Sequence, residues 1–360
     1  MLLHVFPTFA IGGAQVRFAA LANRFGPRWR HGVISLDGRT DCAERIGAHV
    51  PLTLLPAPVA KGEGPYRLWK IRRALAALSP DVLVTSNWGS FDWVAVARTI
   101  PGLRHIHTED GFGPDEAQGQ KRRRVLARRL ILRRSEVVLP SLKLLGHARD
   151  LWRLPPARLH YIPNGLDLRR FTPEGPPATI DVPGEGPLIG TVAKLRAEKN
   201  LARLLRACAL INQPWRLAVI GDGAEQGMLE QLAASLGIAT RVRFLGHVPD
   251  PAAAYRAFDV FALSSDTEQM PFSVLEAMAS GRAVAATDVG DVRAMLAPGQ
   301  APFLAALDEA ALAEALRKLL ADAGLRARLG AANRAKAEQE YGEETMFQAH
   351  AALIEARAGA

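Results

Sequence analysis

Short, mostly apolar runs alternate along the first half of the chain with longer segments in helical spacing. Runs typical of buried strands are found at 4–6, 32–36, 81–85 and 137–139. Between them, segments 14–25 and 66–78 have the length and apolar periodicity of helices. Repetition of strand, helix and strand predicts a parallel sheet covered by helices on both faces.

The same alternation restarts after a stretch rich in proline and glycine between residues 171 and 187, which favours neither a regular helix nor a central strand. Further strand-like runs follow at 188–192, 216–221, 242–245, 260–263 and 283–287. We therefore predict an α/β protein of two doubly wound, Rossmann-like domains that face a central cleft. The predicted first domain is 1–168, the linker 169–184 and the second domain 185–342, with a terminal helix at 343–360 that crosses back to the first domain.

Length and composition agree with this organisation. A chain of 360 residues is too long for one ordinary core and suits two domains. Two cysteines, Cys42 and Cys208, argue against a disulfide framework or a cysteine metal site. The apolar opening stops at Pro7 without a basic leader, so it predicts a buried strand and not a signal peptide. No uninterrupted apolar run approaches about 18 residues, so we expect a cytoplasmic protein without a spanning helix.

Charge is unevenly distributed. The net charge of +9 and the isoelectric point near 10.0 favour a polyanionic partner: nucleic acid, an anionic bilayer or phosphorylated substrates. The excess is concentrated in a basic segment, 121–134, that contains no acid. On a helix its side chains would form two stripes, one of Arg122, Arg129 and Arg133 and the other of Lys121, Arg124 and Arg128. The segment favours an anionic surface, although a solvated basic face is the alternative.

The segment 267–281 is the most informative for chemistry. Pro271 suits the first turn of a helix and Gly281 its end, which places Glu268 in the preceding loop and Glu276 two turns in. Amide groups at the start of such a helix form an anion site. These amides would lie near Met270 to Ser273. The two carboxylates would bracket the site and bind sugar and ribose hydroxyls, unless they are merely a capping acid and a solvated glutamate.

Two further segments lie where a predicted strand passes into a helix. Lys194 and Lys199 follow the strand at 188–192, at the sheet edge where open sheets bind ligands, and they would neutralise a diphosphate unless they are solvated. Gly12 and Gly13 follow the first strand and permit close approach to a phosphate, or simply make a turn. They lack the later glycine of the dinucleotide fingerprint, which disfavours a nicotinamide enzyme.

A third polar cluster contains His105, His107, Glu109 and Asp110. Alternation places both histidines on one face of a strand without a clear fourth ligand, so zinc is disfavoured. We interpret His105 as structural and His107, at the loop mouth, as able to bond a sugar hydroxyl. No signature of a serine hydrolase, a Walker loop or a zinc protease is present.

Together these residues resemble glycosyltransferase family 4, which comprises retaining enzymes of the GT-B fold, over nearly the whole chain. Glu268 to Glu276 matches the family's Glu-x7-Glu motif, and 162–167 matches its interdomain signature. The segment 190–200 matches its donor-phosphate segment, and the Gly12-Gly13 loop matches its glycine turn.

The resemblance implies a role for each of these positions. Glu268 would contact the transferred sugar and Glu276 the donor ribose, while Lys194 and Lys199 would bind the diphosphate. The donor would also be reached by the backbone amides of Met270, Phe272 and Ser273. His107 matches the cleft histidine near the reacting sugar. The family often has arginine where Lys194 stands, which preserves the charge but not the bidentate geometry.

The resemblance also implies a front-face mechanism in which the leaving diphosphate helps to deprotonate the acceptor. This needs no enzyme nucleophile, metal or cofactor, and makes the chain a hexosyltransferase that uses a nucleotide-sugar, by default a UDP-sugar. The basic segment belongs to the domain that binds the acceptor in this family. We expect a lipid-linked or cell-envelope acceptor and peripheral docking at the inner face of the cytoplasmic membrane.

Two rival interpretations remain. A sugar-nucleotide epimerase shares the two-domain architecture and would bind the same donor without an acceptor. A basic nucleic-acid-binding protein ranks lower, because aromatic residues do not interleave with the arginines of the basic segment.

Overall fold

The computed structural model describes residues 1–59, 64, 66–112, 116 and 119–356. The chain forms two compact units. Unit 1 comprises Met1–Asn164 together with Met346–Ala360, and unit 2 comprises Gly165–Thr345.

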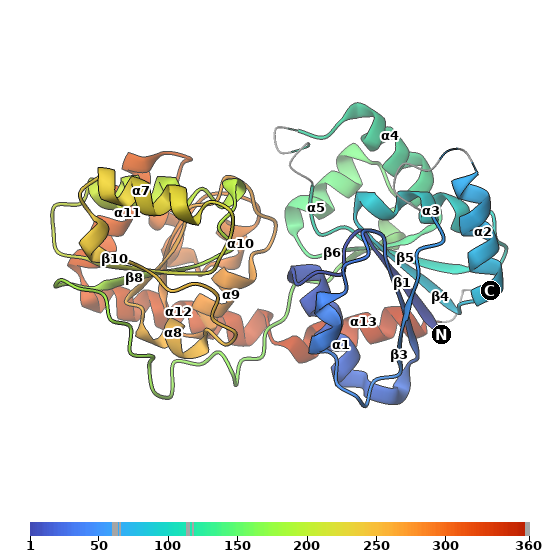
Figure 1. The fold of residues 1–360 in the computed structure, drawn as a ribbon, viewed down its shortest axis with the longest axis horizontal. Coiled ribbons are helices and arrows are strands. Elements are labelled where there is room, and N and C mark those ends of the chain that lie inside the picture. Colours follow the sequence, from blue (N-terminus) through green and yellow to red (C-terminus); the bar gives the residue numbers. More distant parts are fainter. Residues whose placement is uncertain (60–63, 65, 113–115, 117–118, 357–360) are drawn as a thin grey trace. The chain divides into compact units, whose positions relative to one another are not determined.

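Unit 1 is built on a seven-stranded parallel sheet of order β3-β2-β1-β4-β5-β6-β7 (Figure 1). The strands are β1 Leu2–Phe6, β2 His31–Ser35, β3 Leu52–Leu55, β4 Val82–Ser86, β5 Arg104–Thr108, β6 Glu136–Leu139 and β7 Leu159–Tyr161. The helices that pack on it are α1 Gly13–Phe25, α2 Arg67–Leu78, α3 Phe91–Ala97, α4 Arg122–Ile131, α5 Leu142–Gly146 and α13 Glu343–Glu355.

Successive side chains of each strand in unit 1 point to opposite faces of the sheet, so the strands contribute to a core on each face. Leu2 and Val82 pack with residues of α1 and α13, which lie beside each other in Figure 1. The adjacent residues, Leu3 and Leu83, point to the other face and pack with α2 and α3. Burial on both faces explains why these strands consist mostly of apolar residues.

Unit 2 has a six-stranded parallel sheet of order β10-β9-β8-β11-β12-β13. Its strands are β8 Leu188–Val192, β9 Arg216–Ile220, β10 Val242–Phe244, β11 Val260–Leu263, β12 Ala283–Thr287 and β13 Leu304–Ala305. Its helices are α6 Leu201–Ala209, α7 Gln226–Ser235, α8 Ala252–Ala257, α9 Phe272–Ala279, α10 Val292–Met295, α11 Glu309–Ala321 and α12 Ala323–Glu340. Helices α6, α7 and α11 contribute to the core on one face, and α8, α9 and α10 to the core on the other.

The predicted fold class, α/β with two doubly wound sheets, is confirmed. The structure differs at the boundary, because unit 2 already begins at Gly165. Residues 169–184, expected to be a linker, belong to unit 2, where Phe171 and Val182 are buried in its core. The terminal helix runs from Glu343 to Glu355, and residues 357–360 of the predicted segment lie outside the described part of the chain.

Each strand order reverses once, between β1 and β4 in unit 1 and between β8 and β11 in unit 2. Ligands of open parallel sheets bind beyond the carboxyl ends of the strands at such reversals. These two edges are therefore the places to look for a site. In the described part of the chain, no helix is long and apolar enough to cross a membrane.

Candidate active site

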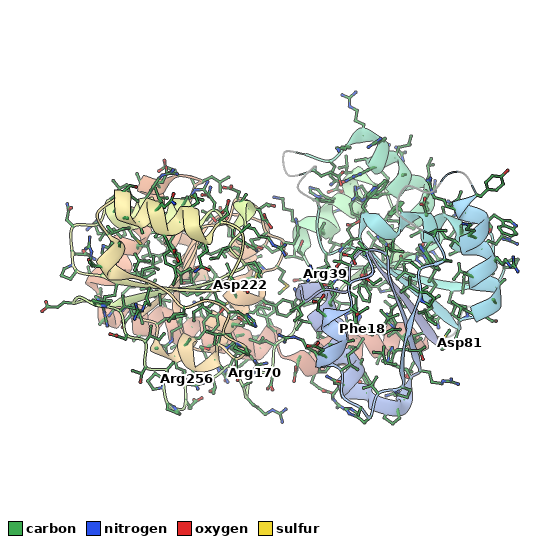
Figure 2. The ribbon with its side chains drawn as sticks, viewed as in Figure 1. Phe18, Arg39, Asp81, Arg170, Asp222 and Arg256 are labelled. Atoms are coloured by element: carbon green, nitrogen blue, oxygen red, sulfur yellow. The ribbon has the colours of Figure 1, made fainter. Side chains whose placement is uncertain are left out.

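At the carboxyl edge of unit 2, the loop after β8 packs backbone to backbone against the loop after β9. The Leu195 amide donates to the Asp222 carbonyl at 2.8 Å. A Cβ atom on Gly221 would lie 1.8 Å from the Ala193 carbonyl oxygen, so this approach requires glycine. The packing brings Lys194 Nζ to 2.5 Å from Asp222 Oδ1, and both side chains are about half exposed at 45% and 48% (Figure 2 labels Asp222). The hydrogen bond from Lys194 lowers the pKa of Asp222.

The second lysine contacts the first glutamate of the predicted pair. Lys199 Nζ donates to Glu268 Oε1 at 2.6 Å, and the Ser265 hydroxyl donates to the same oxygen at 2.7 Å. A Cβ on Gly290 would lie 2.3 Å from the Glu268 carbonyl oxygen, so the loop after β12 supports this residue directly. Lys199 and Glu268, 69 positions apart in sequence, therefore form one preorganised pair.

The predicted helix start is shifted by one residue. Pro271 is the N-cap residue, and α9 begins at Phe272; Gly281, with φ of +68°, follows its end as predicted. The amides of Phe272 and Ser273 are thus those of the first turn, where a helix offers no carbonyl partners of its own. Met270 precedes the cap, with its side chain buried.

Glu276 lies in the second turn of α9 and is partly buried. Its Oε2 atom accepts a hydrogen bond of 2.7 Å from the Tyr255 hydroxyl. Burial raises the pKa of Glu276, and the hydrogen bond from Tyr255 opposes that increase. The two predicted glutamates therefore differ: Glu268 is paired with a lysine, and Glu276 with a neutral phenol.

In unit 1, the glycine turn lies where it was predicted. Gly12 is the N-cap residue of α1, and Gly13 is the first residue of the helix. A Cβ on Gly12 would lie 2.8 Å from Gln15 Oε1, while Gln15 Nε2 donates to the Thr8 carbonyl oxygen. The absence of a side chain at Gly12 thus serves the packing of Gln15, and the donor-binding role of Gly12 and Gly13 stays a prediction.

His107 is not at the loop mouth, and that expectation is wrong. Its ring is fully buried in β5, bonded through Nδ1 to the Thr85 hydroxyl at 2.8 Å and packed edge-on against Phe91. His105 lies on the same face, as alternation predicted, and shares Thr85 at 2.8 Å. Burial lowers the pKa of His105 to about 3. Among the described residues, no group of three or more histidine, cysteine or acidic side chains is arranged to hold a metal ion.

Asp110 is the second residue after β5, at the edge of the sheet. Its Oδ1 atom lies 2.6 Å from Arg17 Nη1, which also donates to Asn164 Oδ1 at 2.8 Å. Its amide donates to Asn87 Oδ1 at 2.7 Å, and Asn87 has a left-handed φ of +56°. The buried Oδ2 atom of Asp110 has no hydrogen-bond partner in the described structure. Strained residues and unpaired buried oxygens both indicate a functional position.

The basic segment divides into a buried part and an exposed part. Arg128 is fully buried, and its guanidinium lies 3.2 Å from Glu109 and 3.3 Å from Glu116. Three aromatic rings surround it at 5.1 to 5.2 Å, those of Trp88, Phe112 and Trp152. Arg124 binds Glu116 at 2.8 Å, with 13% of its side chain exposed. Assigning Arg128 to a basic surface is therefore wrong, and Arg124 also faces inward.

The other predicted stripe stays at the surface. Arg122 and Arg133 are exposed, and Arg129 is partly exposed. Leu126 and Leu130 lie between them along the chain, 55% and 51% exposed. Positions 122, 126, 129 and 130 share one side of α4, and Arg133 follows in the short 3-10 turn Leu132–Arg134. This surface, termed the α4 face below, combines arginine with exposed leucine.

Three residues of these sites were not singled out from the sequence: Arg17, Asp222 and Tyr255. Asp222 lies between two glycines directly after a strand, which is a signal that sequence reasoning can use. Arg17 and Tyr255 lie inside helical patterns and look like any other helix residue until the fold brings their partners to them.

Comparison with known proteins agrees with this arrangement. The family model described as Glycosyltransferase Family 4 matches residues 11–170, and the model described as Glycosyl transferases group 1 matches residues 177–336. A D-inositol 3-phosphate glycosyltransferase of Xylanimonas cellulosilytica is 31% identical over 316 residues, covering 78% of this chain and 72% of the relative. The corresponding enzyme of Corynebacterium urealyticum is 28% identical over 272 residues, covering 68% of this chain and 64% of the relative.

A solved structure shares the fold throughout. HepE from Anabaena, in complex with UDP-glucose, superposes with a TM-score of 0.80 at 19% identity, covering 98% of this chain and 99% of that one. The two parallel sheets and this likeness show the GT-B fold. The two family models show that the chain is a glycosyltransferase. Within that class, the chain belongs to glycosyltransferase family 4.

Proposed function

We propose that the chain transfers a hexosyl group from a UDP-sugar to a hydroxyl of a lipid-linked or cell-envelope glycan, with retention at the anomeric carbon. The observation that carries the proposal is the preorganised pair Lys199–Glu268 beside the start of α9. It combines a cation for the diphosphate with a carboxylate for the sugar hydroxyls. HepE, which has the same fold, was solved with UDP-glucose, and this supports UDP as the nucleotide.

The proposed chemistry needs stabilisation of the leaving group more than a nucleophile. The bond from the anomeric carbon to the diphosphate oxygen breaks, and the acceptor oxygen bonds to the same face of the sugar. The acceptor proton passes to an oxygen of the leaving diphosphate. Lys194, Lys199 and the first-turn amides of α9 stabilise the charge that develops there. No enzyme base, metal or cofactor takes part in these steps.

On the acceptor side, we assign to Asp110 the contact that the sequence resemblance placed on His107. The His107 side chain is fully buried, whereas Asp110 lies beyond the strand with 16% of its side chain exposed. Asp110 Oδ2 and His107 Nε2 are both buried atoms without a hydrogen-bond partner in the described structure. The ion pair with Arg17 keeps the carboxylate in one orientation. Asp110 Oδ2 would accept a hydrogen bond from an acceptor hydroxyl, which orients that oxygen for attack.

The α4 face supports a membrane-bound acceptor. An anionic bilayer attracts basic side chains near its surface by about 1 kcal/mol each, and exposed leucines add apolar burial. Arg122, Arg129 and Arg133 supply the charge, with Leu126 and Leu130 between them. The two D-inositol 3-phosphate glycosyltransferase relatives name a soluble acceptor instead, so the two acceptor classes are tested side by side.

The donor assignment is tested by thermal shift with UDP, GDP, ADP and the corresponding glucose conjugates. A ligand that binds only the folded state raises the melting temperature. We expect a shift with UDP and UDP-glucose that Glu276→Ala abolishes and the exposed-site control Glu230→Ala retains. Absence of a shift with every nucleotide would contradict the proposal. Formation of an epimerised nucleotide-sugar without acceptor would favour the epimerase alternative instead.

The acceptor assignment is tested with vesicles and a radiolabelled donor. We expect binding to vesicles containing phosphatidylglycerol, weakened by about 100-fold in Arg122→Gln/Arg129→Gln/Arg133→Gln. Arg39→Gln/Arg149→Gln/Arg169→Gln removes the same charge elsewhere and serves as control. Label should enter an envelope lipid extract rather than D-inositol 3-phosphate, and Asp110→Asn should reduce transfer without weakening UDP binding. Equal binding to neutral vesicles, or label in inositol phosphate alone, would overturn the lipid acceptor.

A further inference from the structure

Tyr255 contributes one polar atom to an otherwise apolar part of unit 2. It lies in α8, is fully buried, and is surrounded by the rings of Phe171, Phe258 and Phe261 at 5.6 to 5.9 Å. Its hydroxyl donates to Glu276 Oε2 at 2.7 Å. Burial raises the pKa of Tyr255 well above its usual value, so the phenol remains a hydrogen-bond donor at any ordinary pH. A core residue thus reaches the proposed donor site through one atom.

Few charged groups act on Glu276. Arg170 lowers its pKa and Asp250 raises it (Figure 2 labels Arg170). These two residues pair with each other at 3.1 Å. From α12, Arg334 donates to backbone carbonyls, including that of Ala279 at the end of α9. Because the arginine and the aspartate act in opposite directions, Tyr255 is the main partner that favours the ionised carboxylate.

We infer that Tyr255 is a positioning residue for the donor nucleotide: its hydroxyl holds the Glu276 carboxylate in the orientation that binds the ribose hydroxyls. The inference rests on the proposed function, in which Glu276 binds ribose. A carboxylate has about four lone-pair positions, and Tyr255 occupies one on Oε2. The remaining positions accept hydrogen bonds from two neighbouring hydroxyl groups. A neutral carboxyl group would lose part of this capacity, because its proton makes one oxygen a donor.

This arrangement predicts the pH dependence of nucleotide binding. Burial raises the pKa of Glu276, and the Tyr255 hydrogen bond opposes the increase. Tyr255→Phe removes only that hydrogen bond, so the pKa of Glu276 rises further and the group stays protonated to a higher pH. Affinity for UDP should therefore fall with decreasing pH sooner in the variant than in the wild type. Each pH unit by which the midpoint moves makes the affinities differ by up to about tenfold at low pH.

The test is calorimetric titration with UDP between pH 5.5 and 8.5. The proteins are the wild type, Tyr255→Phe, Glu276→Gln and Tyr341→Phe; the last removes a hydroxyl from another buried tyrosine of unit 2. We expect Tyr255→Phe to bind a few-fold more weakly than wild type at pH 8.5 and at least tenfold more weakly at pH 6. Tyr341→Phe should follow the wild type, and Glu276→Gln should be weak at every pH.

A second ligand distinguishes a positioning role of Tyr255 from general destabilisation of unit 2. 2′-Deoxy-UDP lacks one ribose hydroxyl, so its affinity relative to UDP measures the ribose contact. We expect Tyr255→Phe to reduce the preference for UDP over 2′-deoxy-UDP, whereas simple destabilisation would weaken both ligands equally. Adding Tyr255→Phe to Glu276→Gln should change UDP affinity little, because the two residues act through one contact.

The outcomes distinguish this inference from the proposed function. If the wild type binds none of UDP, GDP and ADP, the donor site itself is wrong and the inference falls with it. If the wild type binds UDP while Tyr255→Phe keeps the wild-type pH profile and the wild-type preference over 2′-deoxy-UDP, the donor site stands and Tyr255 is only a core residue.

Discussion

The two units share a parallel doubly wound sheet but use their charged residues differently. At the edge of unit 2, Lys194 and Asp222 are each about half exposed, and 26% of the Lys199 side chain is exposed. In unit 1, Arg128 and its partners Glu109 and Glu116 are fully buried. An exposed pair can exchange its carboxylate for a phosphate at little cost, because water screens both groups. A buried pair cannot, because separation leaves a charge without a partner.

Histidines differ between the units as well. Eight of the nine histidines belong to unit 1, and His247 alone belongs to unit 2. Burial lowers the pKa of His31 to about 4 and that of His350 to about 3, as it does for His105. These three imidazoles of unit 1 therefore stay neutral, whereas at the edge of unit 2 the Lys194–Asp222 ion pair is about half exposed.

Lowering the pH should produce the largest difference in stability between the two units. In the unfolded chain these histidines bind protons near pH 6.5, but in folded unit 1 they do so only near pH 3 to 4. Between these values the unfolded state binds more protons, so stability falls as the pH falls. The loss reaches about 1.4 kcal/mol per histidine for each pH unit. We expect unit 1 to unfold before unit 2 on acidification.

Tryptophan fluorescence and calorimetry measure this order. Trp215 belongs to unit 2, and the other five tryptophans belong to unit 1, so fluorescence reports mainly on unit 1. Between pH 6.5 and 4, the fluorescence transition should move to lower temperature than the bulk of the calorimetric enthalpy. A single transition that moves as one for both signals would contradict the difference between the units.

Substitution of Arg128 gives the next largest effect. Arg128→Met leaves the buried Glu109 without an arginine and Glu116 with Arg124 alone, which should lower the free energy of unfolding by about 3–5 kcal/mol. Arg133→Met, at the exposed end of the same segment, should change it by less than about 0.5 kcal/mol. Urea titration monitored by tryptophan fluorescence compares them. If both variants lost a similar free energy of unfolding, the contrast between a buried and an exposed arginine would be wrong.

The lysines of unit 2 should affect catalysis rather than stability. Lys199→Ala removes a preorganised cation from the proposed diphosphate site, and we expect kcat/KM to fall by about 10²- to 10³-fold. Lys194→Ala should cost less, because its side chain is 45% exposed against 26% for Lys199, and water screens its charge more. Steady-state transfer assays compare both with Lys318→Ala on the surface of α11. Equal rates for Lys199→Ala and the control would remove the lysine from the mechanism.

The smallest expected effect is a gain in UDP affinity when the carboxylate that pairs with Lys194 is removed. Asp222 competes with the diphosphate for Lys194, so Asp222→Asn should tighten UDP binding by about two- to fivefold. Calorimetric titration at low ionic strength measures the change, and salt should diminish it. Weaker binding of UDP by Asp222→Asn would show that the aspartate supports the ligand instead of competing with it.

Structural features that depend on residues close together in the sequence were predictable. Apolar runs located most strands, and the proline–glycine pair around α9 located that helix to within one residue. The lysines after β8 and the glutamates around α9 were predictable because both follow strand ends, and parallel strand ends meet at one edge of a sheet. Lys199 and Glu268 do meet there, at 2.6 Å.

The sequence by itself determined the fold class, the family motifs and the net positive charge, because these follow from periodicity and from residues close together in the chain. It did not determine which charges face water. Arg128 and Arg133 look equivalent in the sequence, yet one is enclosed by aromatic rings and carboxylates and the other is exposed. His107, Asp110 and Tyr255 acquired their positions in the same way. Burial and long-range partners come from how distant segments pack, and only the tertiary structure decides that.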